Sequence, residues 1–210
     1  MDIIKALNWR YATKKFDSEA VISDEKIDLL KTAFNLTASS YGLQPVKMLI
    51  VSDKSTLNAL VPLSSNQKQV GQASHLCVFC VKTTIDEAYI RAFFDRIIAT
   101  NNTPDDVLSP FRSSVISSFA SKSDDDIFKW GAKQAYLAMG NMLTVCATQG
   151  IDACPMEGFD PEQYDRFFKL NEKGLRSVLV MPIGYRAEDD MFASMKKVRK
   201  PLTDSIIEIK

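Results

Sequence analysis

The feature that most limits how this 210-residue chain can fold is an apolar segment over residues 126–149. Its spacing predicts one long helix that ends at Gly150, and the second half of that helix has apolar side chains nearly all round. A helix without a polar face must be covered on every side. A chain of this length has limited material for such cover, so we expect a second copy to supply part of it, in an interwoven homodimer.

Short apolar runs rich in branched residues predict the strands of a sheet, at residues 46–51, 76–81 and 177–184. The third run contains Pro182, which has no backbone N–H, so we expect its later half at a sheet edge or a bulge. Other segments predict helices over residues 2–9, 24–36, 55–61, 84–100 and 161–168. Helices dominate and strands are few, so we expect an α+β fold with a mixed central sheet and helices packed on it.

No repeat, low-complexity tract or linker divides the chain, so residues 1–210 are expected to form a single domain. Residues 100–123 are polar, serine-rich and poorly periodic, which makes them the best candidate for an excursion or a mobile lid. The N-terminus lacks the pattern of a signal peptide, and no stretch has the ~20 apolar residues of a membrane span. A cytoplasmic protein without membrane contact is the expectation.

Charge and residue counts exclude several classes of function. The 26 basic and 26 acidic side chains cancel, which argues against a surface built throughout for nucleic acid. A single histidine, His75, excludes metal sites that need two, and it is expected in the core or at a strand edge. Cys77 and Cys80 fall on opposite faces of a strand, so they cannot act as a pair, and all four cysteines are expected to be buried.

Two basic clusters at opposite ends of the chain could meet on one anion. The first lies in residues 10–15 and the second in residues 196–200. In an extended segment Lys197 and Arg199 face the same way. The chain has neither a glycine-rich dinucleotide motif nor a P-loop, so a bound phosphate must take its counter-charge from side chains. Solvated surface charge and contact with nucleic acid or an acidic partner remain open as alternatives.

Two short loops are further candidates for a binding site. Ser39 and Ser40 lie in a polar turn between a predicted helix and a predicted strand. Residues 155–159 (PMEGF) contain Gly158, whose small size lets backbone amides approach a flat ligand. An ordinary turn is the alternative for both loops.

These motifs, in this order along the chain, resemble the nitroreductase family. They are residues 10–16 (RYATKKF), Ser39-Ser40 with Gln44-Pro45, residues 155–160 (PMEGFD) and Lys197-Val198-Arg199. The opening MDII and the KQAYLAMGN segment extend the likeness over nearly the whole chain. The order and spacing look most like the oxygen-insensitive NAD(P)H nitroreductase and dihydropteridine reductase branch. The resemblance implies a nitroreductase-like fold and a homodimer that binds two FMN groups in clefts between its subunits.

The resemblance also implies a role for each matching position. Arg10, Lys197 and Arg199 match the phosphate-binding cations, and Tyr11 and Ala12 match the two backbone positions that follow the first of them. Lys14 matches a lysine at the N1–O2 edge of the flavin, where a cation stabilises the anionic reduced ring. No side chain is expected to act as a catalytic acid or base, because flavin N5 carries the chemistry.

The remaining positions lie around the ring and the substrate. Glu157 and Gly158, after Pro155, match the stretch whose backbone amide faces flavin N5, Asn66 and Gln69 match residues at the ring edge, and Ser39 and Ser40 match a loop contributed by the partner subunit. Ile116 or Phe119 corresponds to an aromatic residue that gates the substrate.

Four positions depart from the branch, which usually has histidine, serine, asparagine and lysine where this chain has Tyr11, Ala12, Gly42 and Gln69. Loss of a cation at Gln69 would weaken stabilisation of the reduced ring, so the redox potential and the choice between NADH and NADPH stay open.

The implied activity is ping-pong reduction of nitroaromatics, quinones or a dihydropteridine by NAD(P)H on a single flavin face. One alternative keeps the fold and the flavin but changes the chemistry, to reductive dehalogenation or flavin fragmentation. A second alternative is a dimeric binding module without enzymatic activity.

Overall fold

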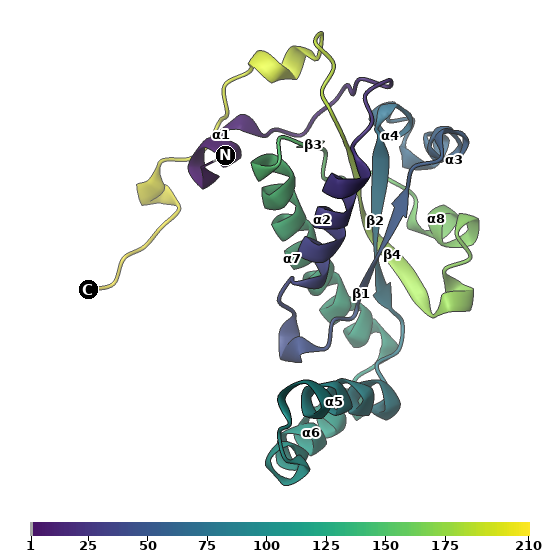
Figure 1. The fold of residues 1–210 in the computed structure, drawn as a ribbon, viewed down its shortest axis with the longest axis vertical. Coiled ribbons are helices and arrows are strands. Elements are labelled where there is room, and N and C mark those ends of the chain that lie inside the picture. The colour runs from purple at the N-terminus through teal and green to yellow at the C-terminus, as the bar shows by residue number, and fades with distance from the viewer. Residues whose placement is uncertain (1) are drawn as a thin grey trace.

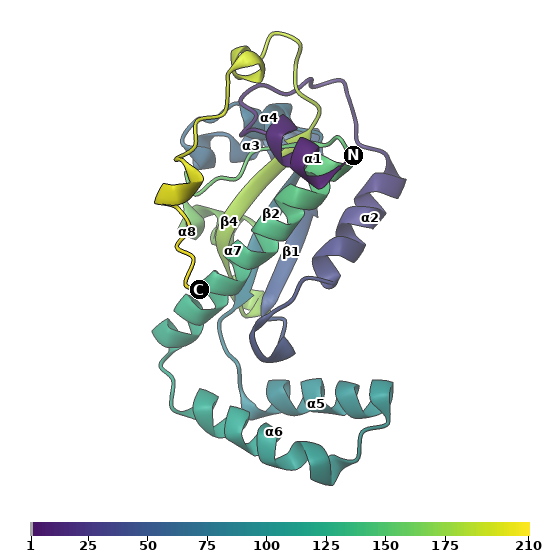
Figure 2. The same ribbon diagram turned by 90° about the vertical axis from the view of Figure 1, so that its left-hand side faces the viewer.

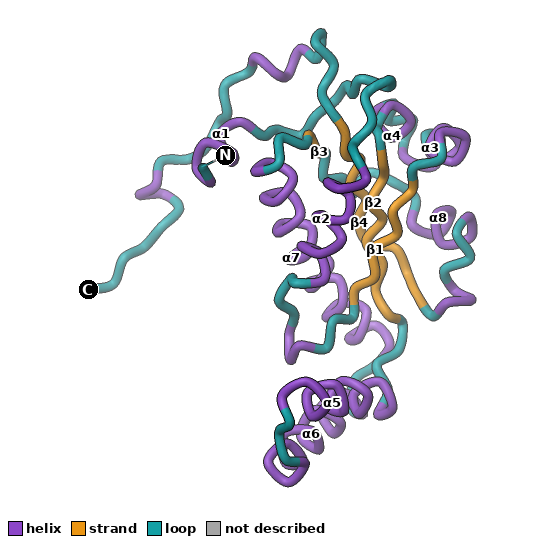
Figure 3. Tube along the Cα trace, viewed as in Figure 1, coloured by secondary structure: helices purple, strands orange, loops and turns teal. Residues whose placement is uncertain are grey.

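A four-stranded antiparallel sheet forms the centre of the fold, in a computed structural model that describes residues 2–210. The strands are β1 (Val46–Val51), β2 (His75–Lys82), β3 (Asp152–Ala153) and β4 (Leu175–Gly184), and they lie in the order β1-β2-β4-β3. Figure 1 shows helices on both faces of this sheet, and Figure 3 sets the strands apart in orange. The predicted α+β fold is confirmed, although the pairings between these strands are all antiparallel rather than mixed.

Most of the helices lie close to where the sequence predicts them, apart from those over residues 69–72 and 105–120, which it did not predict. Their bounds are α1 (Ile3–Trp9), α2 (Asp24–Asn35), α3 (Lys54–Leu60), α4 (Gln69–Gln72), α5 (Glu87–Asn101), α6 (Asp105–Ala120), α7 (Asp124–Thr148) and α8 (Pro161–Phe167). Local capping explains several starts. Asp2 accepts hydrogen bonds from the backbone of Ile4 and Lys5, and Asp160 accepts one from the backbone of Gln163.

The two faces of the sheet pack into two separate cores. Cys77 and Phe79 of β2 pack with α2 and α7 on one face, whereas Val78 and Cys80 pack with α3, α4 and α8 on the other. The prediction that the two thiols point to opposite faces is therefore confirmed. Burial raises the pKa of Cys77 and of Cys80 to about 12, so both stay protonated near neutral pH.

Pro182 does not lie where the sequence analysis placed it. Strand β4 lies inside the sheet, between β2 and β3, and the irregularity in register falls between Phe79 and Cys80. The Pro182 carbonyl accepts a hydrogen bond from the Cys154 N–H. The N–H and C=O of a strand residue point to the same side, so the missing donor of Pro182 faces the point where β3 ends and the chain leaves the sheet. A proline is tolerated there because little regular pairing is lost.

Helix α7 runs along the sheet for 25 residues and supplies much of one core. A reciprocal pair of hydrogen bonds between Ser123 and Asp126 caps its start, two residues before the predicted one, and Gly150 follows it with a φ of +65°. The apolar side chains of α7 are only partly covered within the chain, since Tyr136 and Leu137 each remain 49% exposed.

Residues 100–123, expected to be irregular, are largely helical. Helix α6 pairs with α5 to form a hairpin that projects from one end of the sheet (Figure 2). Val115 and Phe119 of α6 pack with Phe94 of α5 in a small core of their own. The serines on the outer face of α6 make its apolar spacing hard to recognise in the sequence. The role of the segment as a lid stays a prediction.

After β4 the chain leaves the sheet and passes near α1 on its way to the C-terminus, as Figures 1 and 2 show. In the described chain after β4, the regular structure consists of two short 3₁₀ helices, Met191–Ser194 and Leu202–Asp204. Within residues 2–210, none of the helices has the length and apolar character that crossing a lipid bilayer would require.

Candidate functional site

A buried carboxylate, Asp190, fixes the loop that carries the first basic cluster. One of its oxygens accepts hydrogen bonds from the Tyr11 hydroxyl at 2.9 Å and from the backbone N–H groups of Lys14 and Lys15 at 3.0 and 3.2 Å. Burial acts to raise the pKa of Asp190, but the hydrogen bonds from Phe192, Lys14 and Tyr11 outweigh it and hold the pKa below its usual value. Asp190 therefore stays ionised and keeps the loop in one conformation.

A second carboxylate, Asp152, ties the same loop to the end of β4. It accepts hydrogen bonds from the backbone N–H of Arg186 at 2.9 Å and from Arg186 Nε at 2.8 Å. The Arg186 guanidinium lies over the rings of Trp9 and Tyr11, 4.2 and 4.6 Å from their centroids. Tyr11 is thus held by Asp190 at its hydroxyl and by Arg186 at its ring, which accounts for an aromatic residue at this departure from the branch pattern.

The structure brings the two basic clusters together. Lys197 Nζ donates a hydrogen bond to the Arg10 carbonyl. An open hollow of about 700 Å³ lies elsewhere, whereas the hollow here, of about 470 Å³, is lined by seven of the predicted site residues: Arg10, Tyr11, Ala12, Lys14, Pro155, Lys197 and Arg199.

The cations of this hollow lack acidic partners. Among residues 2–210, no carboxylate forms an ion pair with Arg10, Lys197 or Arg199. Burial and the charge of Arg199 lower the pKa of Arg10, and burial followed by Arg10 and Arg199 lowers the pKa of Lys197. Like charges gathered without a counter-charge repel one another, so the hollow is suited to an anion.

A second hollow, of about 420 Å³, adjoins the first because Pro155 lines both. Its wall is mostly apolar, with Met139 and Leu143 of α7, and its polar part is the loop at Glu157. Glu157 and Gly158 are exposed residues, and neither backbone N–H has an acceptor in the described part of the chain. Two neighbouring donors beside an apolar wall suit the polar edge of a flat ring.

Two predicted residues, Asn66 and Gln69, flank Gln67 near the start of α4. Gln67, which the sequence analysis missed, donates a hydrogen bond from Nε2 to the Gly158 carbonyl at 2.8 Å. Gln69 is nearly buried and donates from Nε2 to Gln67 Oε1, also at 2.8 Å. Asn66 is exposed, with a left-handed backbone (φ +57°), and its side chain forms no hydrogen bond with any other residue described.

Ser39 and Ser40 lie away from both hollows. The Ser40 backbone N–H donates to Gln134 Oε1 of α7 at 2.8 Å, and Ser39 Oγ accepts a hydrogen bond from the Gln44 backbone. Gly42 next to them has a φ of +74°, and a Cβ there would lie 2.8 Å from the Phe93 ring, so asparagine at this position would require that ring to move. Within one chain, the serine loop and the cation cluster do not form one site.

The two candidates for the gate also lie apart from the hollows, in the α5–α6 hairpin. Phe119 is buried and packs edge-on against Trp130, with centroids 5.0 Å apart. Ile116 is half-buried in the same core. This arrangement within one chain does not bring either residue to the cation cluster.

Some functional contacts gave no usable signal in the sequence. Tyr136 of α7 donates a hydrogen bond to Glu157 Oε1 at 2.6 Å, and this bond and burial raise the pKa of Tyr136. Asp190 and Gln67 act on residues far from them in the chain, and nothing in their local sequence names a partner. The sequence offers only a weak signal for Asp190, which is its position beside Asp189 shortly after an apolar strand.

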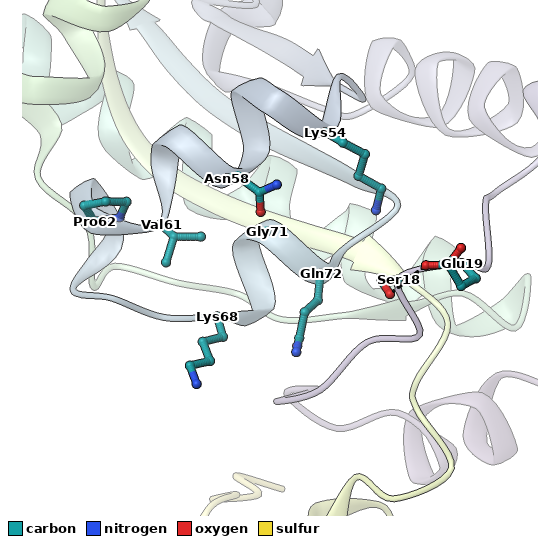
Figure 4. A pocket seen from close by; sticks show the side chains of 9 residues that line it. All are labelled: Ser18, Glu19, Lys54, Asn58, Val61, Pro62, Lys68, Gly71 and Gln72. Atoms are coloured by element: carbon teal, nitrogen blue, oxygen red, sulfur yellow. Dashed lines mark hydrogen bonds between the residues drawn. The ribbon is translucent and has the colours of Figure 1, made fainter.

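The hollow of about 700 Å³, lined in part by Gly71 and Gln72 of α4, contains none of the predicted site residues (Figure 4). Lys54 and Lys68 lie at its rim together with Glu19. Lys54 already donates a hydrogen bond to the Ala73 carbonyl at 2.9 Å. Its size does not make it the functional site.

Comparisons with known proteins agree with this geometry. A family model described as "Nitroreductase family" matches residues 7–185. The chain is 33% identical to a Salmonella typhimurium protein named oxygen-insensitive NAD(P)H nitroreductase, over the full length of both chains. It is 32% identical to an Enterobacter cloacae protein of the same name, covering 99% of this chain and 100% of the relative.

Solved structures share the fold. A nitroreductase-like protein from Streptococcus mutans superimposes with a TM-score of 0.86 at 20% identity, covering 100% of this chain and 98% of the other. A protein from Exiguobacterium sibiricum, whose structure was solved in complex with FMN, gives a TM-score of 0.85 at 19% identity over 100% and 98% of the two chains.

Proposed function

The chain belongs to the nitroreductase family, and from that premise we propose that it is an FMN-dependent oxidoreductase that uses NAD(P)H to reduce nitroaromatics, quinones or a dihydropteridine. The observation that carries the proposal is the meeting of unpaired cations from both ends of the chain beside two unpaired backbone donors. Relatives named as NAD(P)H nitroreductases and a structural neighbour in complex with FMN support the choice of cofactor and reductant.

The residues present fit FMN. A phosphate monoester carries between one and two negative charges near pH 7, and Arg10, Lys197 and Arg199 form a cationic hollow that lacks a counter-charge. The adjoining hollow has an apolar wall for the ring and the free N–H groups of Glu157 and Gly158 for its N5 edge. Lys14 extends from the clamped loop into the first hollow, where its charge would lie beside the ring.

When bound, FMN supplies two-electron chemistry, taking hydride from NAD(P)H and passing reducing equivalents to the acceptor. The chain's part is to bind, to orient and to supply positive charge: Lys14 stabilises negative charge on the ring, and the loop amides donate to its N5 edge. One hollow serves both substrates in turn, which gives ping-pong kinetics. His75 takes no part, because it is nearly buried in β2 with Nδ1 2.8 Å from Ser74 Oγ.

A homodimer is part of the proposal, and exposed apolar surface supports it. Tyr136 and Leu137 of α7 are half-exposed, and the residues of the C-terminal tail, 195–210, include Ile207 and Ile209 at 90% and 95% exposure. Such side chains gain free energy when a partner covers them. The partner would also bring its own serine loop, residues 39–40, toward the ring, since that loop lies outside the hollows of its own chain.

Purification with added FMN tests the proposal. We expect a yellow protein that absorbs near ~450 nm and is bleached by NADH or NADPH without oxygen, then recoloured by a quinone or a nitroaromatic. Size exclusion should give the mass of two chains. A colourless protein that rejects FMN and binds nucleic acid or an acidic protein would replace the enzyme with a binding module.

A further inference from the structure

Among the residues described, one side chain from outside the turn, that of Gln67, hydrogen-bonds to the backbone of the turn that carries the free donors, whereas Tyr136 bonds only to the Glu157 side chain. The Phe159 N–H donates to the Glu157 carbonyl at 2.9 Å, which closes a three-residue turn around Gly158. Pairing of Met156 with Val180 anchors the chain before the turn. The Asp160 N–H anchors it afterwards, through the Leu63 carbonyl at 2.8 Å.

Between these anchors, Gln67 makes the one hydrogen bond that reaches the backbone of residues 157–159 from elsewhere in the described chain. Its amide has a defined orientation, because Oε1 accepts a hydrogen bond from Gln69 Nε2 while Nε2 donates to the Gly158 carbonyl. Gln69 in turn contacts Met156 Sδ at 3.9 Å and is 6% exposed. The amide of Gln67 is therefore locked at both ends.

The contact fixes the direction of the free donors. The peptide between Gly158 and Phe159 is planar, and it is bonded at both ends, through the Gly158 oxygen to Gln67 and through the Phe159 N–H to Glu157. Only rotations within Gly158 remain to turn the Gly158 N–H. A Cβ on Gly158 would lie 2.8 Å from Gln67 Nε2, so the glycine is also what lets Gln67 reach the turn.

We propose that Gln67 is a positioning residue, which acts through the Glu157–Phe159 turn to aim the Glu157 and Gly158 N–H groups at the N5 edge of bound FMN. This inference rests on the proposed function and goes beyond it, because it assigns control of the ring environment to a residue that lines neither of the two hollows. Gln69 is hydrogen-bonded to Gln67, and both amides are uncharged. Gln69 therefore does not supply the positive charge of the lysine that the branch usually has at this position.

The test compares Gln67→Ala and Gln67→Glu with Gln72→Ala, a glutamine of α4 that does not contact the turn. In the FMN-loaded protein, both Gln67 variants are expected to make the flavin midpoint potential more negative. They should also slow flavin reduction by NAD(P)H roughly 10-fold, the effect of losing one hydrogen bond of about 1.4 kcal/mol. FMN affinity should change less than the potential, since the phosphate cluster is untouched, and Gln72→Ala should match the wild type.

Gln67→Glu adds a pH signature that a structural role would not produce. An ionised carboxylate cannot donate to the Gly158 carbonyl, whereas a protonated carboxyl can, so the difference in potential from the wild type should shrink as pH falls. In the flavin-free protein, NMR relaxation should show a more mobile Gly158 amide in Gln67→Ala than in Gln72→Ala.

The outcomes separate the two claims. A protein that binds FMN and is reduced by NAD(P)H, but whose potential and Gly158 mobility are unchanged in both Gln67 variants, overturns the inference and leaves the proposed function standing. A protein that does not bind FMN overturns both. Gln67→Glu keeps the size of the side chain, so the test survives even if Gln67→Ala loses stability.

Discussion

The two basic segments that meet at the anion site are held in very different ways. Asp190 and Asp152 hold residues 10–15 in place, because they accept hydrogen bonds from the backbone of this segment as well as from its side chains. Residues 196–210 are exposed apart from half-buried Lys197, and the Lys197 contact with Arg10 is the one hydrogen bond that joins them to an earlier part of the described chain.

This difference indicates that half of the site is preformed and half is completed by its ligands. The N-terminal cations are in place before any anion arrives, so they lose little conformational freedom on binding. In the proposed function, the C-terminal cations would gain their order from the FMN phosphate, and the apolar tail beyond them would gain it from a partner subunit. Variants in both segments test this difference in how they are held.

The largest effect is expected at the clamp. Asp190→Ala leaves the backbone N–H groups of Lys14 and Lys15 and the Tyr11 hydroxyl without their acceptor, and should lower the free energy of unfolding by about 3 kcal/mol. Urea denaturation measures it. Asp189→Ala is the matched control, since Asp189 is exposed and pairs only with Lys15; equal losses in the two variants would show that Asp190 is no clamp.

The next effect concerns the loosely held half. Arg199→Ala should weaken FMN binding by about 1.5 to 3 kcal/mol, roughly 10- to 150-fold in Kd, because it removes a charge-assisted contact to the phosphate. The stability of the flavin-free protein should not change, since the side chain bonds only to the neighbouring Val198 carbonyl. Fluorescence titration with FMN measures the affinity, with Lys200→Ala as control. Unchanged affinity in Arg199→Ala would remove the C-terminal cluster from the site.

The tail offers a third, smaller effect. If a partner covers Ile209, Ile209→Asp should weaken self-association by about 2 kcal/mol, the free energy of burying one such side chain. Lys210→Asp is the control at the neighbouring position. Analytical ultracentrifugation across a dilution series measures the dimer constant. A variant that dimerises like the wild type would place the interface elsewhere.

The smallest effect is a change in the contribution of Asp190 to stability at low pH. The pKa of Asp190 is lowered by folding, so its contribution to stability is present above the usual aspartate pKa of about 3.9 and is lost as pH falls through the lower folded value. The difference in unfolding free energy between the wild type and Asp190→Asn should therefore shrink as pH drops below about 4. A constant difference down to the acid transition would contradict this assignment.

Local rules were enough for most elements of the fold. Asp2 and Asp160-Pro161 mark helix starts by capping within three residues, and the apolar run at 46–51 gives a strand with the predicted bounds. Helix α6 was missed because serines dilute its apolar spacing, although Val115 and Phe119 stand one turn apart. The position of Pro182 in the sheet was predicted wrongly because β3, the strand on the side that the Pro182 backbone faces, is only two residues long.

The candidate site likewise has some features that the sequence predicts and others that it does not. The basic clusters and the loop at Gly158 stand out in the sequence by residue type, whereas the contacts that orient them do not. Asp190 bonds to Lys14 across 176 positions, and Gln67 bonds to Gly158 across 91. Neither residue has a local pattern that names its partner, so only the folded arrangement reveals it.

The clamp on residues 10–15 also sets an order of events during synthesis. Its two carboxylates lie 139 and 176 positions along the chain from Thr13 and Lys14, and pairings between such distant segments form only after long loops have closed. The cations of residues 10–15 are therefore synthesised long before the carboxylates that hold their loop. The loop can take its folded arrangement only after Asp190 has left the ribosome.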